Sequence, residues 1–349
     1  LFVMISYGIS KMSLFVQIVV FLVLSNYIID TKCQTSDVSN AKVERVIDIS
    51  SQLVKINTKI VVDNSANKKS LDSYLVTFDD NHRPHLAYIG ASINKNTVQV
   101  NKVDEKHWRV DLSGSNAIGA GVASSPTIEL EAVFTRLLEP YPTQILQSER
   151  QFVLYNGNHY FASPYSTKSQ STKVKLPPSG TLESFTKLKP SAQTDRNINL
   201  GPYENIPSNG FSELKVHYEN NSPFLSVTKL ERSIEISHWA GIISVEEVID
   251  VQHNGAKLKG PFSRYDYQRE PTNGISSVKS WRTKLPATAR DIYYRDEIGN
   301  ISTSNLKLSA VSTIAELRPR FPLFGGWKTH YVLGYYVSTQ GFLFNEGNQ

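Results

Sequence analysis

The sequence predicts a mainly β protein made of two tandem β-sandwich-type domains that follow a signal peptide. Three observations lead to this prediction. Apolar and polar residues alternate with a period of two along many short runs. Helical periodicity is scarce along the whole chain. The strand-like runs also fall into two groups that share an internal repeat, which favours two units of related architecture.

The clearest strand pattern covers residues 128–134, where Ile128, Leu130 and Phe134 alternate with other residues as in a half-buried strand. Residues 152–155 and 159–161 flank an Asn-Gly-Asn tripeptide at 156–158. Since Asn and Gly tolerate the positive φ angles of tight turns, this segment predicts a β-hairpin. Further strand-like runs occur at Val43–Ile49, Val54–Val62, Leu75–Phe78, Lys173–Leu176, Leu225–Leu230, Ser233–Ser237 and Ser244–Val251.

A weak internal repeat relates the two groups of strands. Residues 44–50 (ERVIDIS) match residues 231–237 (ERSIEIS), and without a gap VVD at 61–63 then falls on VID at 248–250. The first match could arise by chance, because alternating strands resemble one another. The second match, which needs no gap, favours two related β domains. Residues 199–210 are rich in Pro, Gly and Asn, which is typical of a loop at a boundary. We therefore expect domains at 34–203 and 204–349.

The first 33 residues (1–33) are expected to be a signal peptide with some upstream residues. Lys11 supplies a positive region, LFVQIVVFLVL at 14–24 an apolar region, and Thr31 and Cys33 the residues before a cleavage site at Gln34. The apolar run is shorter than the ~20 residues that a membrane span requires. Cys33 is the single cysteine, so the mature chain has no disulfide and must rely on its core.

Composition and motifs exclude several classes of function. The net charge of +5 includes no Lys/Arg run, so we expect no nucleic-acid partner. The sequence contains none of the common nucleophile-elbow, phosphate-loop or zinc-protease motifs. His82 and His85 are close in sequence, but Pro84 between them favours a solvated turn over a helical metal pair. We expect no catalytic residue, no metal site and no cofactor.

Two aromatic segments do not follow the strand pattern: GPFSRYDYQ at 260–268 and PRFPLFGGWKTHY at 319–331. Their Pro and Gly residues interrupt both helix and strand, so we expect irregular loops held by ring packing. Tyr, Trp and Arg are also typical anchors of protein interfaces. Packing between the two domains is the alternative. The interface candidates are His238, Trp239, Arg264, Tyr265, Tyr267, Phe321, Phe324 and Trp327.

These two segments, together with four others, closely resemble the ribophorin I family. The others are EPYPTQILQSE at 139–149, GNHYF at 157–161, VHYENNSPF at 216–224 and YYRDEIGN at 293–300. The resemblance covers roughly residues 42–349 and thins between 64 and 126. It implies the lumenal part of a subunit of the endoplasmic-reticulum oligosaccharyltransferase complex. That complex transfers a preassembled oligosaccharide from dolichol diphosphate to Asn in Asn-x-Ser/Thr of nascent proteins.

Further expectations follow from this resemblance. The absent catalytic motifs indicate a non-catalytic subunit in the endoplasmic reticulum membrane, anchored by a C-terminal span beyond Gln349. Its partners would be the catalytic and accessory subunits, with the nascent polypeptide and the translocon as further candidates. The alternative is a secreted β-sandwich glycan-binding module or hydrolase, in which Tyr265, Tyr267 and Trp327 would stack on sugar rings.

Two sequons suggest N-glycosylation sites, at Asn220 and Asn300. Pro223 follows the first sequon and weakens it as an acceptor. Gly299 precedes the second sequon and favours an exposed turn, so Asn300 is the better candidate.

Overall fold

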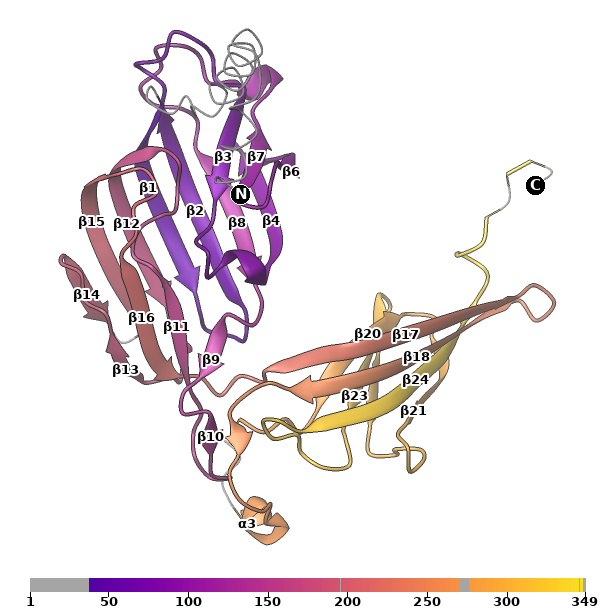
Figure 1. Cartoon of the computed structure of the whole chain (residues 1–349). Coiled ribbons are helices and arrows are strands. Elements are labelled where there is room, and N and C mark those ends of the chain that lie inside the picture. The colour runs from indigo at the N-terminus through magenta and orange to yellow at the C-terminus, as the bar shows by residue number, and fades with distance from the viewer. Residues whose placement is uncertain (1–37, 195, 270–275, 345, 348–349) are drawn as a thin grey trace, which may run out of the picture.

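The computed structural model describes residues 38–194, 196–269, 276–344, 346 and 347. The expected signal peptide (1–33) lies outside the described residues. The described chain is mainly β, as predicted, and forms two units (Figure 1). The first unit contains the strands up to residue 219, and the second contains the strands from residue 225 onward.

The first unit is a β-sandwich in which one large sheet packs against two smaller ones. The large sheet contains, in spatial order, β14 (Ser191–Thr194), β15 (Asn197–Ile206), β12 (Ser166–Lys175), β1 (Ser39–Asp48), β2 (Val54–Asp63), β8 (Ile128–Phe134), β4 (Leu86–Ile93) and β5 (Asn96–Val98). One smaller sheet contains β13 (Leu182–Phe185), β16 (Glu213–Glu219), β11 (Phe152–Asn158) and β9 (Leu138–Pro140). The other contains β3 (Ser73–Thr77), β7 (His107–Asp111) and β6 (Val100–Lys102). Two 3-10 helices, η2 (Arg83–His85) and η3 (Gly114–Asn116), lie in loops.

The alternation in β8 determines which face of the large sheet is buried. Ile128, Leu130 and Phe134 point into the core, whereas Glu129 and Glu131 are exposed, as the period of two predicts. One end of this face packs on β11 and β16, and the other end packs on β3 and β7. A single continuous apolar face therefore holds both smaller sheets.

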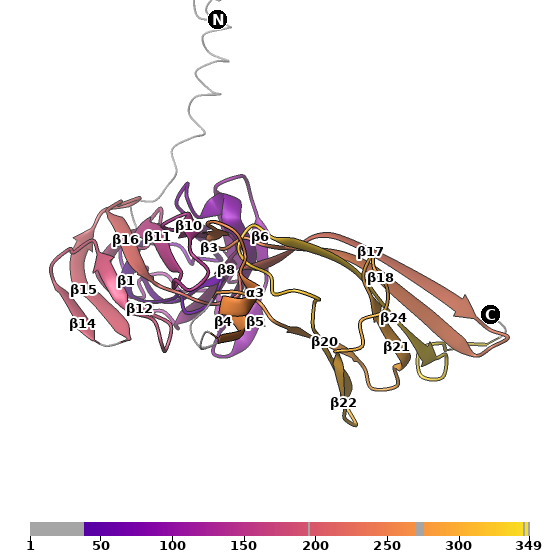
Figure 2. The same cartoon turned by 90° about the horizontal axis from the view of Figure 1, so that it is seen from below.

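The second unit is a smaller β-sandwich. Its main sheet contains β17 (Leu225–Ser237), β18 (Ile242–His253), β24 (Lys328–Ser338) and β21 (Arg290–Arg295). The opposing sheet contains β20 (Trp281–Pro286), β23 (Ser312–Leu317) and β22 (Asn305–Leu308). Two further short strands, β10 (Gln144–Ile145) and β19 (Lys257–Leu258), pair with each other, and a short helix α3 (Arg264–Arg269) follows β19. Viewed from below, the second unit extends away from the first, with the turn between β17 and β18 near its far end (Figure 2).

The two halves of the internal repeat form equivalent strand pairs. Residues 44–50 lie largely in β1, which pairs antiparallel with β2. Residues 231–237 lie in β17, which pairs antiparallel with β18. The prediction of two consecutive strands in each half is therefore confirmed.

The hairpin predicted around 156–158 is wrong. These residues continue strand β11, which pairs with β16 from Phe152 to Asn158. Gly157 is not needed for a turn. A Cβ there would lie 2.4 Å from the hydroxyl oxygen of Tyr155, so the absent side chain leaves room for a fully buried tyrosine ring.

The loop predicted at 199–210 is also wrong over most of its length. Residues 197–206 form β15, which pairs with β12 and buries Ile198, Leu200 and Tyr203. The register shifts opposite Gly201 and Pro202, so the proline sits at a bulge, where a missing N–H is tolerated. The position expected for the domain boundary, 203/204, therefore falls inside a strand. The chain passes to the second set of sheets only after β16.

Candidate functional site: the junction between the two units

The two aromatic segments identified in the sequence meet in space. The rings of Phe262, Tyr267, Phe321, Phe324 and Trp327 form one aromatic cluster. Phe262 contacts Tyr267, Phe324 and Trp327 at centroid distances of 5.7, 5.6 and 5.7 Å, and Phe324 lies 5.4 Å from Trp327. Such pairs contribute about 0.5–1.5 kcal/mol each beyond their buried area. Ring packing of these segments is thus confirmed.

The expectation that residues 260–268 contain no helix is wrong, because α3 begins at Arg264. The hydroxyl of Ser263 accepts a hydrogen bond from the Asp266 N–H at 3.3 Å, as a residue at the N-cap does. Ser263 and Asp266 have the spacing of a capping pair, and an acidic residue in the first turn is favourable. This spacing was the sequence signal for the helix.

Backbone hydrogen bonds connect the two units beside this cluster. Strand β10 of the first unit runs parallel to β19 of the second. The Lys257 N–H donates to the carbonyl of Thr143 at 2.9 Å, and the Lys259 N–H donates to that of Ile145 at 2.7 Å. The junction therefore contains a small two-stranded parallel sheet, with one strand from each unit, and does not depend on side chains alone.

Two glutamines of the first unit bind backbone groups of the second. Gln147 makes a reciprocal pair with Ser263, donating to its carbonyl and accepting from its N–H, both at 3.0 Å. Gln151 is fully buried; its Oε1 accepts from the Ala256 N–H at 2.8 Å, and its Nε2 donates to the carbonyl of Asn220 at 2.8 Å. An amide supplies both a donor and an acceptor, as these positions require. No periodic pattern in the sequence marks either residue.

His253 is buried at the end of β18, next to the same junction. Its Nδ1 accepts the Gly255 N–H at 3.1 Å, so its Nε2 carries the proton and donates to the carbonyl of Ser276 at 3.0 Å. Burial lowers the pKa of His253 to about 4, although the hydrogen bond to Ser276 opposes this change. The imidazole is therefore neutral and structural, with both nitrogens engaged.

The interface candidates on α3 divide into packed and exposed residues. Tyr267 is half-buried in the aromatic cluster, and its hydroxyl lies 3.1 Å from that of Ser277. Tyr265 is 66% exposed and pairs with Arg269, whose guanidinium lies 5.0 Å from the ring. Arg264 is exposed as well. Since the Tyr267 and Trp327 rings contact other rings, Tyr265 alone among the three suggested sugar-stacking residues presents its ring broadly to solvent.

The structure does not bring His238 and Trp239 to the junction. Both lie in the turn between β17 and β18, near the end of the second unit that points away from the first (Figure 1). Trp239 is fully exposed. These two residues therefore form a separate feature from the aromatic cluster.

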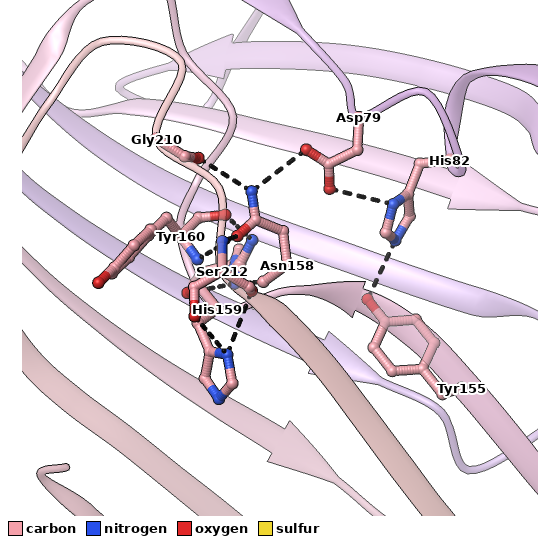
Figure 3. A network of polar contacts seen from close by, with 9 residues as sticks. Asp79, His82, Tyr155, Asn158, His159, Tyr160, Gly210 and Ser212 are labelled. Carbon is pink, nitrogen blue, oxygen red and sulfur yellow. Dashed lines mark hydrogen bonds and ion pairs between the residues drawn. The ribbon is translucent and has the colours of Figure 1, made fainter. Parts of the chain in front are cut away.

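A second group of polar residues lies buried inside the first unit (Figure 3). Arg45, from β1, donates to the carbonyls of Asn158, His159 and Tyr160 at 2.6, 2.8 and 3.0 Å. The Asn158 side chain in turn accepts the Tyr160 N–H at 2.9 Å and donates to Asp79 at 3.3 Å. Burial lowers the pKa of Arg45 and raises that of Tyr155 nearby. This buried polar network, hereafter the polar hub, gives the GNHYF segment at 157–161 a structural role although the segment is not a turn.

His82 belongs to the same hub, and the expectation of a solvated turn for it is wrong. Its ring is 4% exposed, and Nε2 lies 3.0 Å from the hydroxyl of Tyr155 while Nδ1 lies 3.3 Å from an Asp79 carboxylate oxygen. The ring also packs edge-on against Phe134. Among the residues that the structure describes, no three His, Asp or Glu side chains gather where they could hold a metal ion.

The two sequons differ in accessibility. Asn220 is 1% exposed, and its amide donates to the carbonyl of Ser51 at 3.1 Å and accepts from the Ser222 N–H at 3.0 Å. Asn300 is exposed and follows a turn in which Gly299 has a φ of +141°. The side-chain nitrogen that would receive a glycan is thus engaged at Asn220, whereas Asn300 lies on the surface.

Comparison with known proteins places the chain in a family. The sequence profile described as ribophorin I matches residues 38–349. The chain belongs to the ribophorin I family. Within this family, the chain is 43% identical to dolichyl-diphosphooligosaccharide–protein glycosyltransferase subunit 1 of Caenorhabditis elegans, over 88% of this chain and 53% of that protein. It is 38% identical to subunit 1A of Arabidopsis thaliana, over 90% of this chain and 53% of that protein. The chain thus spans about half the length of these relatives.

Among solved structures, the chain is similar to an M1 zinc metallopeptidase from Deinococcus radiodurans, with 10% identity and a TM-score of 0.33. The match covers 67% of this chain and 52% of that one, and it is too distant to support an inference about either fold or activity. Over the part of the chain that the structure describes, no helix combines the length and apolar character needed to span a bilayer.

Proposed function

We propose that this chain is part of a non-catalytic subunit of the oligosaccharyltransferase complex in the endoplasmic reticulum membrane, with the described residues on the lumenal side. The observation that carries this proposal is the family match over residues 38–349, together with relatives named as subunit 1 of the dolichyl-diphosphooligosaccharide–protein glycosyltransferase. In this proposal, the complex transfers a preassembled oligosaccharide from dolichol diphosphate to Asn in Asn-x-Ser/Thr of nascent proteins.

The geometry of the junction supports a structural role over a chemical one. The buried His253 has both nitrogens engaged with backbone groups, and the amide of Gln151 is likewise committed. Neither group is positioned to take up a proton from a substrate. The hydrogen bonds hold the two units together, the ring contacts pack α3 onto the second unit, and α3 presents Arg264 and Tyr265 to solvent.

The partners in this proposal are the catalytic and accessory subunits of the complex. Arg and Tyr are frequent anchors of such interfaces, so exposed Arg264 and Tyr265 are the contact residues that we favour. The nascent polypeptide and the translocon are further candidate partners. Attachment to the membrane would come through a span beyond Gln349.

A complementation experiment tests this proposal. Cells depleted of the endogenous subunit would receive the full-length protein with Arg264→Ala and Tyr265→Ala, or a control with Lys307→Ala and Leu308→Ala, two exposed residues of β22. We expect the first variant to accumulate normally but to co-purify less with the catalytic subunit, and sequon occupancy of reporter glycoproteins to fall. The control should behave as wild type.

Two results would contradict the proposal. If depletion left both the composition of the complex and sequon occupancy unchanged, the chain would not be a working subunit. If the Arg264 and Tyr265 variant assembled fully and yet abolished oligosaccharide transfer, the segment would take part in the chemistry, and the non-catalytic role would be wrong.

A further inference from the structure

Strand β17 forms a long border of the second unit. It spans Leu225–Ser237 and pairs on one side with β18; among the described residues, no strand pairs with its other side. Every residue from 227 to 236 is exposed. The backbone N–H and C=O groups along this edge are therefore open to another strand. Figure 1 shows β17 along the border of its sheet, facing the open space beside the first unit.

An apolar row runs along one face of this strand. Val227, Leu230, Ile234 and Ile236 are 55, 52, 58 and 49% exposed. Their partners across the sheet in β18 are Val251, Ile249, Val245 and Ile243, which are all buried in the core of the second unit. The row thus continues the core-facing side of the sheet beyond the part that β20, β22 and β23 cover. Single exposed apolar side chains are ordinary, but four of them along one face of a strand are typical of a binding surface.

Charge divides the two faces of the strand. Arg232 lies within the apolar row, but its guanidinium pairs at 2.6 Å with the nearly buried carboxylate of Glu247, so the row carries no unpaired charge there. The opposite face carries Lys229, Glu231, Ser233 and Glu235, all exposed. Lys229 pairs with Glu231 at 2.8 Å, so Glu235 is the acidic side chain that is open to a partner on this face.

The usual protections of a sheet edge are few on β17. Protein edges are commonly blunted by short strands, prolines, bulges or inward-pointing lysines. β17 contains no proline, and its register shift falls near its start, between Val227 and Lys229. Its two basic side chains, Lys229 and Arg232, are both paired with glutamates of the same sheet. Residues 230–237 are then regularly paired with β18. This regular stretch is a suitable template for strand addition.

We propose that β17 is a docking strand to which an extended segment of a partner protein adds along the free edge. The segment would carry apolar residues on one face, beside Leu230, Ile234 and Ile236, and a basic residue on the other face, beside Glu235. An extended strand satisfies the open backbone groups, and its alternate side chains match the two faces of β17. A docked helix would leave the edge groups unpaired. The surface is distinct from the α3 residues, so its test does not depend on them.

The test is site-specific photo-crosslinking in the full-length protein in cells. Benzoyl-phenylalanine replaces Leu230, Ile234 or Ile236, one position at a time, and the crosslinked peptides are sequenced by mass spectrometry. Strand addition predicts that the crosslinks advance in one direction along one partner segment, in steps that match the spacing of the three positions on β17. Leu308 and Val311 are exposed apolar controls in the same unit, at 74 and 82%, and should not crosslink to that segment.

A pair of matched variants completes the test. Leu230→Lys combined with Ile234→Lys should reduce the yield of the crosslink from position 236 at least tenfold. It should leave the thermal unfolding midpoint unchanged, because both residues are already exposed. Leu308→Lys with Val311→Lys should leave the crosslink intact. Three results would overturn the proposal: no crosslink from any β17 position, crosslinks whose spacing follows a helix, or crosslinks to β17 of a second copy of this chain.

Discussion

Gly325 lies directly against the carbonyl of Ala256 at the junction of the two units. A Cβ at Gly325 would lie 1.8 Å from that carbonyl oxygen, a separation that no rotamer change can relieve because the obstacle is backbone. The residue also forms an isolated parallel bridge with Lys257. Close approach of these two chain segments therefore requires glycine.

We expect Gly325→Ala to destabilise the protein by about 1–3 kcal/mol, the usual cost of forcing extra volume into a packed region. Denaturant unfolding of the purified protein measures this change. Gly119→Ala is the matched control, since its added Cβ would have its nearest contact at 3.4 Å from a Val122 methyl and its φ is not positive. Equal stabilities of the two variants would show that the junction relaxes freely.

Tyr267 and Tyr265 should respond differently to truncation, although they are close neighbours on α3. Tyr267→Ala removes a half-buried ring from the aromatic cluster and should cost about 1–3 kcal/mol, less than for a fully buried aromatic. Tyr265→Ala removes an exposed ring and should change stability by less than about 0.5 kcal/mol. Thermal and chemical unfolding measure the stability of the two variants. A larger loss of stability for Tyr265→Ala than for Tyr267→Ala would contradict the packing of Tyr267 in the aromatic cluster.

The free energy of unfolding should decrease at low pH because of His253. Its pKa is lowered from an ordinary 6.5 to about 4 in the folded chain, so the unfolded chain binds the proton more readily. This contribution is fully present above pH 6.5 and is lost as pH falls toward 4, at a total of about 3 kcal/mol. His253→Gln should abolish it, so wild type should lose about 3 kcal/mol more than the variant between pH 7 and pH 4. Parallel pH profiles of unfolding free energy would contradict this expectation.

Asn300 should carry an N-linked glycan after entry into the secretory pathway, and Asn220 should not. Asn300 is exposed, whereas the Asn220 amide is buried and hydrogen-bonded to Ser51. Mass spectrometry of both tryptic peptides from secretory expression measures occupancy. Asn300→Gln should remove the glycan with little effect on folding. Full occupancy at Asn220 would indicate modification before this region folds.

Arg45→Lys should be costly despite the retained charge. The guanidinium reaches three carbonyls at once, and a lysine cannot reproduce that fork. We expect a loss of about 2–4 kcal/mol from broken charge-assisted bonds and unsatisfied carbonyls. Arg109→Lys, on the exposed side of β7, is the control and should change stability by less than about 0.5 kcal/mol. Unfolding curves compare the two directly.

The sequence predicted the strands well wherever one face is buried. The alternation in 128–134 and 244–251 is a direct result of core burial, so β8 and β18 were recognisable. The sequence-based prediction failed where Gly and Pro, which usually form turns, lie within strands and allow close packing. Gly157 makes room for Tyr155, and Gly201 with Pro202 occupies a bulge, so residues that normally mark turns lie within β11 and β15.

The site was predictable only in part. Aromatic residues around Pro and Gly indicated ring packing at 260–268 and 319–331, and these two segments do meet. Gln147, Gln151 and Arg45 gave no local signal. Their roles depend on backbone groups distant in sequence, and only the completed fold brings those groups within hydrogen-bonding distance.

The attachment of the second unit by its near end has a mechanical consequence. From His253 at the junction to the turn at Trp239, β18 extends over Ile242–His253, or ~40 Å at about 3.3 Å per residue. A rotation of about 5° at the junction would therefore displace the far turn by roughly 3.5 Å, over the same lever arm. The stiffness supplied by Gln151 and by the Gly325 contact thus determines how precisely the turn at Trp239 is positioned relative to the first unit.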